Sequence, residues 1–186
     1  MLASVFGWAQ QKLPLQSMGK VSLGLTLLSV DYQTPIQGSW ILDSKFGTGP
    51  SATIENGKYL PAYLAQSLFL SSEARYLYSF TKRQELGRDI ALNSASYFGI
   101  KARYNFKPYP GAGRDLDSFF SRRDDRKYSN TLSLAGVWGL QRNLDSNFLF
   151  NIYIGPGYMI DFNNKSSSFY PDLGLVFSYV FIKSKK

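Results

Sequence analysis

The sequence contains no cysteine and no histidine among its 186 residues. Without cysteine the chain can form no disulfide and no thiolate metal site. Without histidine, Ser-His and Cys-His nucleophile activation, imidazole base catalysis and imidazole metal sites are excluded. We therefore expect no metal, no cofactor and no catalytic residues, and only carboxylate pairs stay open as a route to catalysis.

Long apolar runs are also missing, because no stretch approaches the roughly 18 residues that a membrane-spanning helix needs. If the chain crosses a membrane, it does so with strands in a closed barrel, since lipid offers no partners for open backbone groups. Aromatic residues are plentiful, with 13 Tyr and 14 Phe, and they favour β-strands.

The formal net charge is +8, which suits nucleic acid, an anionic membrane surface or simple solubility. The basic residues are dispersed over connecting segments and the C-terminus instead of forming one block. We therefore predict no nucleic-acid partner.

The first nine residues look like the second half of a secretory signal peptide. A short apolar stretch precedes Gly7 and Ala9, which place small residues at the −3 and −1 positions of a cleavage site. We expect residues 1–9 to be a signal-peptide remnant and residues 10–186 to form one β-barrel domain of an exported protein. The alternative is that the first residues pack as a strand or turn.

Apolar and polar residues alternate with period two, which is typical of strands with one polar face. Six stretches alternate clearly, namely 21–27, 68–80, 96–106, 131–140, 148–155 and 172–181. Two weaker stretches, 38–46 and 53–65, bring the count to eight. The sequence thus predicts an all-β, antiparallel up-and-down barrel of eight strands, with a bulge or kink at Pro156 and a short helical candidate at 81–91.

The polar face of these strands suggests an interior. It is rich in small residues, as a narrow barrel interior must be. It also carries Glu73 and Arg75 on one strand and Lys101 and Arg103 on the next, which predicts an internal ion-pair network. The alternative is that these are surface pairs of a soluble sheet. With the apolar face outward, the aromatic residues near strand ends would form girdles in a transmembrane barrel.

Three stretches carry a resemblance to a known family. Residues 73–104 contain a Glu-x-Arg-Tyr-x-Tyr strand, and residues 137–159 contain Trp-Gly-x-x-Arg and Gly-x-Gly-Tyr. The C-terminus has the pattern polar-x-Gly-x-x-aromatic-x-aromatic, formed by Asp172, Gly174, Phe177 and Tyr179 and followed by Phe181. In these features the chain resembles the small outer-membrane β-barrel proteins of Gram-negative bacteria, within the porin-like superfamily.

The resemblance implies a location in the bacterial outer membrane, contact with its lipids, and a last strand that the barrel-assembly machinery recognises. A narrow barrel filled by its own side chains conducts little or nothing. We therefore expect a non-catalytic structural, surface-interaction or accessory role, alone or within a larger outer-membrane complex.

The long charged loop at 107–128 is the candidate contact surface. Its contact residues for a partner or for lipopolysaccharide would be Arg114, Phe119, Phe120, Arg122 and Arg123. The alternative is a solvated loop whose phenylalanine pair folds back onto the rim.

Two other functions stay open. One is a soluble, lipocalin-like barrel that binds a small ligand in an apolar interior. The other is a lipid-modifying outer-membrane enzyme, in which Asp161 or Glu73 would have to replace histidine as the base.

Overall fold

One antiparallel sheet of eight strands forms the protein in a computed structural model, which describes residues 14–108 and 129–184. The strands are β1 (Ser17–Gly24), β2 (Leu28–Pro35), β3 (Trp40–Glu55), β4 (Lys58–Tyr76), β5 (Ala95–Asn105), β6 (Thr131–Asp145), β7 (Phe148–Asp161) and β8 (Ser166–Ser184). The predicted all-β antiparallel fold with eight strands is confirmed.

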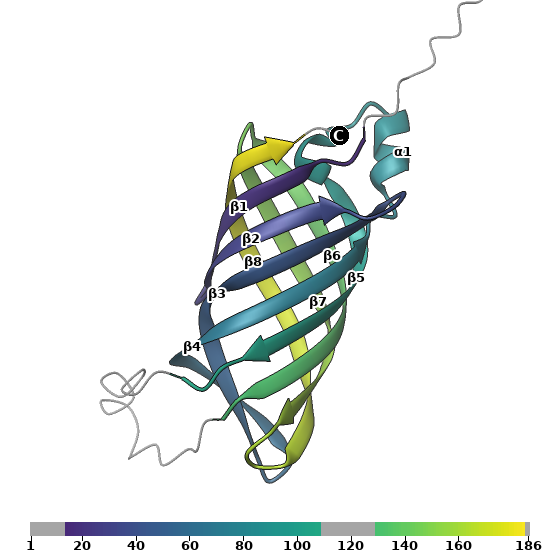
Figure 1. The fold of residues 1–186 in the computed structure, drawn as a ribbon. Helices are drawn as coiled ribbons and strands as arrows, with labels where there is room; N and C mark the ends of the chain where they lie inside the picture. Colours follow the sequence, from purple (N-terminus) through teal and green to yellow (C-terminus); the bar gives the residue numbers. More distant parts are fainter. Residues whose placement is uncertain (1–13, 109–128, 185–186) are drawn as a thin grey trace, which may run out of the picture.

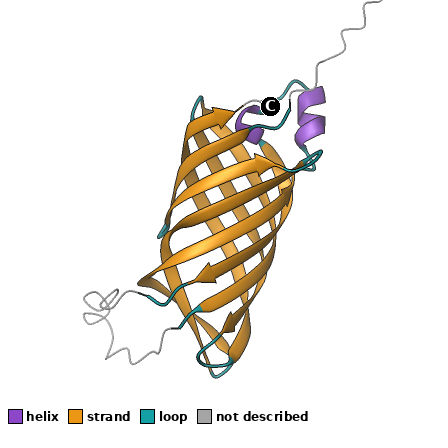
Figure 2. Ribbon diagram, in the orientation of Figure 1, coloured by secondary structure: helices purple, strands orange, loops and turns teal. Residues whose placement is uncertain are grey.

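The strands close into a ring of hydrogen-bonded neighbours (Figures 1 and 2). Each strand pairs with the next in the chain, and β8 returns to pair with β1. Ser17 pairs with Ser184, so the two ends of the described ring lie together at what we call the termini end. The opposite end, which we call the hairpin end, carries the tips of the β3–β4 and β7–β8 hairpins.

The connection from β4 to β5 contains two short helices, α1 (Phe80–Glu85) and η1 (Ala91–Asn93). The helix expected at 81–91 is thus present as α1, in the first half of that stretch. The strand expected at 68–80 ends at Tyr76, because Phe80 turns into α1 and buries its ring. Neither of these helices, which are the two in the described residues, is long and apolar enough to cross a membrane.

One predicted strand was wrong and one strand was missed, although the count of eight was right. The stretch 53–65 is not a separate strand, because its residues belong to β3 and β4 on either side of Asn56-Gly57. Both turn residues have positive φ, 51° and 74°, as a two-residue hairpin turn requires. The strand missing from the prediction is β2, which follows β1 after a tight turn closed by Gly24 N–H donating to the Leu27 carbonyl.

Of the bulge or kink expected at Pro156, the described pairing shows no bulge. Pro156 pairs with Pro171 of β8 in the same register as the residues around it. On the other side, β6 and β7 pair at Ala135–Gly157 and again at Trp138–Ile154 without a shift. The missing N–H of the proline falls within this gap in the ladder, so the strand continues without an extra residue.

Burial is inverted relative to an ordinary water-soluble sheet. Most of the large apolar side chains of the strands point away from the ring, and Leu23 and Ile100 are 60% and 68% exposed. Charged and small polar side chains fill the interior, where Asp43 and Arg75 are fully buried. The period-two alternation therefore separates an apolar exterior from a polar interior.

Candidate functional site

A charge network fills the middle of the ring and is centred on Asp43 of β3. The Asp43 carboxylate contacts Lys20 Nζ of β1 at 3.0 Å, Arg75 Nη2 of β4 at 2.9 Å and Lys45 Nζ at 3.3 Å. Lys45 also contacts Asp31 of β2 at 3.2 Å. Four consecutive strands thus share one network, since inward positions recur at every second residue.

Glu73 and Arg75 lie in this network and contact each other. Arg75 Nη2 donates to Glu73 Oε2 at 2.7 Å, and Arg75 Nη1 donates to Gln141 Oε1 of β6 at 3.0 Å. The Arg75 guanidinium also lies over the Tyr97 ring, 4.7 Å from its centroid. Arg75 therefore joins the Asp43 cluster to the opposite wall of the ring.

Lys101 and Arg103 point into the interior but do not pair with Glu73 or Arg75. Lys101 forms an ion pair with Asp172 of β8 and lies 4.2 Å from the centroid of the Tyr153 ring. Arg103 Nε donates to Asn105 Oδ1 at 2.7 Å, and its guanidinium lies over Phe69 at 4.0 Å from the ring centroid. The four residues expected to form one network are therefore divided among separate contacts.

The C-terminal pattern is divided between the two faces of β8. Asp172 and Gly174 face the interior, whereas Phe177, Tyr179 and Phe181 are about half exposed on the outside. A Cβ at Gly174 would come within 2.5 Å of the phenol ring of Tyr153 on the neighbouring strand. The glycine thus makes room for the aromatic ring that supports Lys101.

Buried apolar clusters lie toward both ends of the interior. At the termini end the two buried clusters consist of Leu15, Ile41, Leu77, Phe80, Ala95, Tyr97, Ala135 and Val137, and of Met18, Leu92, Leu149 and Val180. The tips of the two long hairpins pack together at the hairpin end, where Ala52, Ile54 and Met159 are buried beside the stacked rings of Tyr59 and Tyr170. The polar network therefore lies between these apolar clusters.

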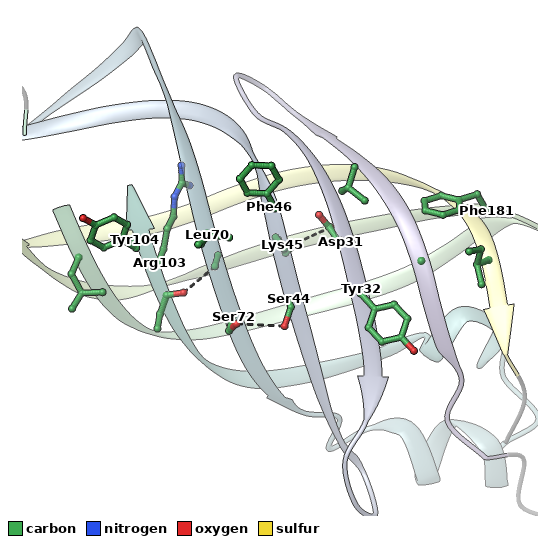
Figure 3. A pocket seen from close by; sticks show the side chains of 16 residues that line it. Asp31, Tyr32, Ser44, Lys45, Phe46, Leu70, Ser72, Arg103, Tyr104 and Phe181 are labelled. Carbon is green, nitrogen blue, oxygen red and sulfur yellow. Dashed lines mark hydrogen bonds and ion pairs between the residues drawn. The ribbon is translucent and has the colours of Figure 1, made fainter. Parts of the chain in front are cut away.

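The outer wall carries a shallow groove of about 660 Å³ that crosses several strands (Figure 3). Its floor includes Ser44 and Ser72, whose hydroxyl oxygens are 3.4 Å apart. Tyr32, Phe46 and Leu70 are among the larger side chains along it. The groove is largely apolar, although the charged residues Asp31, Lys45 and Arg103 are also among those that line it.

Asp161, one of the two candidate bases, has a structural role at the β7–β8 turn. Its carboxylate accepts hydrogen bonds from the Ser129 hydroxyl and from the backbone N–H groups of Asn163 and Asn164. Glu73, the other candidate, is bound to Arg75. Both carboxylates are thus engaged in holding the ring together.

Other predicted residues lie outside the described part of the chain. These are the signal remnant at 1–9 and the loop contacts Arg114, Phe119, Phe120, Arg122 and Arg123. Sequence reasoning also missed Lys20, Asp31, Asp43 and Lys45, although each occupies a polar position in an alternating stretch. The alternation of residues 28–35 was the available signal for Asp31.

In the interior of the ring, buried carboxylates and buried cations neutralise one another. The four carboxylates of Asp31, Asp43, Glu73 and Asp172 each contact at least one cation. Each of these buried carboxylates is thus compensated by a neighbouring positive charge. No protein-family model matches this chain, and no curated protein or solved structure matches it.

Proposed function

We propose that this chain is an integral outer-membrane β-barrel without catalytic activity, with a structural, surface-interaction or accessory-subunit role. The observation that carries this proposal is the inverted burial of the ring. Asp43 and Arg75 are 0% exposed, whereas Ile100 and Leu23 are more than half exposed. In water this arrangement would leave a continuous apolar belt exposed to solvent, but in a bilayer the belt contacts hydrocarbon.

Strand length and aromatic placement support the same proposal. β5 has 11 residues, and a membrane-crossing strand needs roughly 9–11. Trp40, Tyr76, Phe98 and Trp138 pair in one row across four strands near the termini end. A second aromatic group lies toward the hairpin end, where Tyr104 contacts Phe106 and Phe162, and Tyr158 contacts Phe169. Aromatic girdles of this kind mark the two interfaces of a bilayer.

The proposed orientation places the termini end in the periplasm and the hairpin end outside the cell. The longest connection, residues 106–130, begins and ends at the hairpin end, as extracellular loops do, whereas the termini end carries the short connections 36–39 and 146–147 and the longer connection 77–94. The connection that contains Arg114 and Phe119 joins β5 to β6 at the hairpin end. It would face lipopolysaccharide or a protein partner, while Phe177 and Tyr179 on β8 would serve recognition by the barrel-assembly machinery.

A further part of the proposal is that the barrel conducts little or no current. Apolar clusters lie at both ends of the interior, and the ion pairs around Asp43 fill its middle. Eight-stranded barrels are just wide enough for side chains to fill. Planar-bilayer recordings of the refolded chain should accordingly lack porin-sized conductance steps.

The two other functions fit the residues less well. A lipocalin-like barrel needs an apolar interior, and the interior here holds Lys20, Asp43 and Arg75. A lipid-modifying enzyme needs an available base, and Glu73 and Asp161 are both engaged in hydrogen bonds. Neither function therefore has an observation in its favour.

The experiment that tests the proposal is expression with a signal peptide, followed by fractionation and an unboiled detergent gel. We expect the chain in the outer-membrane fraction and a folded band that shifts on boiling, because the barrel resists the detergent until heated. A monomer that stays soluble without detergent would contradict the proposal. Normal outer-membrane assembly of a Phe177→Ser and Tyr179→Ser variant would contradict the assigned role of β8.

A further inference from the structure

A second, polar pocket of about 280 Å³ lies at the termini end beside α1. Four cationic side chains and two hydroxyls surround it, namely Lys82, Arg83, Arg88, Arg142, Ser79 and Ser96. Ser96 shares the outward face of β5 with Phe98, and Arg142 shares the outward face of β6 with Trp138. The pocket therefore opens on the outer side of the rim, away from the interior charge network.

Arg83 of α1 and Arg142 of β6 are held in place by hydrogen bonds to neutral oxygens. Arg83 Nε and Nη2 donate to the Asp89 carbonyl at 3.2 and 2.7 Å. Arg142 donates to the Gln141 carbonyl at 2.8 Å and to Ser96 Oγ at 3.1 Å. These bonds fix the direction of both guanidinium groups without neutralising their charge.

Positive charge dominates the lining, because four cations and no carboxylate surround the pocket. The Asp89 carboxylate accepts from Ala91 N–H at 2.8 Å and from Asn143 Nδ2 at 3.2 Å. Within residues 14–108 and 129–184, no carboxylate forms an ion pair with any of the four cations. Arg83 and Arg142 line the same pocket, so their charges repel each other. An anion bound between them would relieve this repulsion.

The two hydroxyls add hydrogen-bond donors to the pocket. Ser79 Oγ accepts from Ser96 N–H at 2.6 Å, and Ser96 Oγ accepts from Arg142. Because each oxygen is used as an acceptor, each hydroxyl keeps its own hydrogen for a further partner. A pocket that offers guanidinium, ammonium and hydroxyl donors matches the several acceptor oxygens of a phosphate group.

The pocket adjoins the aromatic row at the termini end. Ser79 follows Tyr78, whose hydroxyl accepts from Trp138 Nε1 at 3.0 Å and whose ring lies 5.1 Å from that of Phe98. Tyrosine and tryptophan prefer the headgroup level of a bilayer, which is also the level of lipid phosphates. We propose that this pocket binds the phosphate of a phospholipid headgroup in the leaflet at the termini end. The choice of a lipid as the source of the phosphate rests on the proposed membrane location.

The test is a binding measurement on the full refolded chain in a maltoside detergent, which contains no phosphate. Native mass spectrometry would follow dioleoylphosphatidylglycerol, dioleoylglycerol with the same chains but no phosphate, and inorganic phosphate. The variant Arg83→Gln with Arg142→Gln should bind phosphatidylglycerol about tenfold or more weakly, since two charge-assisted contacts are lost. Lys58→Gln with Lys107→Gln removes two charges near the hairpin end and is the matched control.

Each outcome decides the proposal. Selective loss of phosphatidylglycerol in the arginine variant, with dioleoylglycerol binding unchanged, supports it, and equal binding by all variants overturns it. Equal affinity of the native chain for inorganic phosphate would make this a soluble-anion site and overturn the lipid assignment.

A second variant guards against misfolding of the arginine variant. Lys82 and Arg88 are exposed cations of the same pocket. The variant Lys82→Gln with Arg88→Gln should therefore also weaken phosphatidylglycerol binding. Failure of the membrane proposal has its own readout, because the chain would then stay soluble without detergent. Binding of inorganic phosphate can still be measured on such a soluble chain.

Discussion

Asp43 is the residue on which the interior network depends most, because three cations share its carboxylate. Asp43→Asn keeps the shape of the side chain but leaves Lys20, Lys45 and Arg75 with one negative charge fewer. Breaking a buried ion pair by removing one partner costs about 3–5 kcal/mol, so we expect a loss of that order in the free energy of unfolding. Urea titration of the protein in lipid vesicles, followed by tryptophan fluorescence, measures it.

The neighbouring residue supplies the control for this change. Ser44 points to the outer face, and Ser44→Ala should alter the free energy of unfolding by no more than about 0.5 kcal/mol. Combining Asp43→Asn with Lys20→Met removes one charge of each sign and should recover part of the loss, because a balanced interior avoids a lone charge. An Asp43→Asn protein as stable as the native one would show that the network contributes nothing to stability.

The β3–β4 hairpin depends on the conformation of its two-residue turn. Gly57 has φ of 74°, a left-handed conformation that costs other residues about 1–2 kcal/mol. We expect Gly57→Ala to lower the free energy of unfolding by about that amount. The same urea titration measures the change.

Gly136 of β6 offers a matched control for the turn. A Cβ there meets no atom within 4 Å, and its φ is not in the left-handed region. Gly136→Ala should therefore be neutral or stabilising by up to about 1 kcal/mol, because alanine restricts the unfolded chain. Equal effects of the two substitutions would contradict the assigned turn conformation.

Local pattern predicted the faces of the strands better than their ends. Alternation places Leu23 and Phe177 on the apolar faces of their strands, and the small and charged residues on the opposite faces predicted that the apolar faces point outward; both residues are exposed. The turn between β1 and β2 was hidden because Leu25 and Leu27 continue the apolar alternation through it. Asn56-Gly57 was read as an interruption, although this dipeptide is the strongest short hairpin signal.

Contacts between distant strands could not be predicted from one sequence. The pairing of Lys101 with Asp172 depends on where β5 and β8 stand around the ring, which no local pattern encodes. Asp172 was therefore predicted only as part of the C-terminal pattern, and its pairing with an interior lysine emerges from the structure. The apolar clusters likewise depend on how the β4–β5 connection and the hairpin tips fold over the ends.

The membrane proposal is tested most directly on the outer surface of the ring. Ile100 lies on β5 between Phe98 and Tyr104, which belong to the two aromatic groups, and is 68% exposed. An arginine on the lipid face costs about 2–4 kcal/mol at the bilayer midplane and about 0–1 kcal/mol near the interfaces. We therefore expect Ile100→Arg to lower the free energy of unfolding in lipid vesicles by about 2–4 kcal/mol.

The control for Ile100→Arg introduces an arginine at the edge of the ring. Ser146 lies in the exposed turn between β6 and β7, and Ser146→Arg should cost no more than about 1 kcal/mol, since the turn is in water or at the interface. The comparison distinguishes strands that face lipid from strands that face water. On a strand that faces water, the cost of an exposed arginine does not depend on its distance from the middle of the strand. Similar small losses for both variants would place the apolar belt in water and count against the membrane barrel, even if the ring of eight strands were intact.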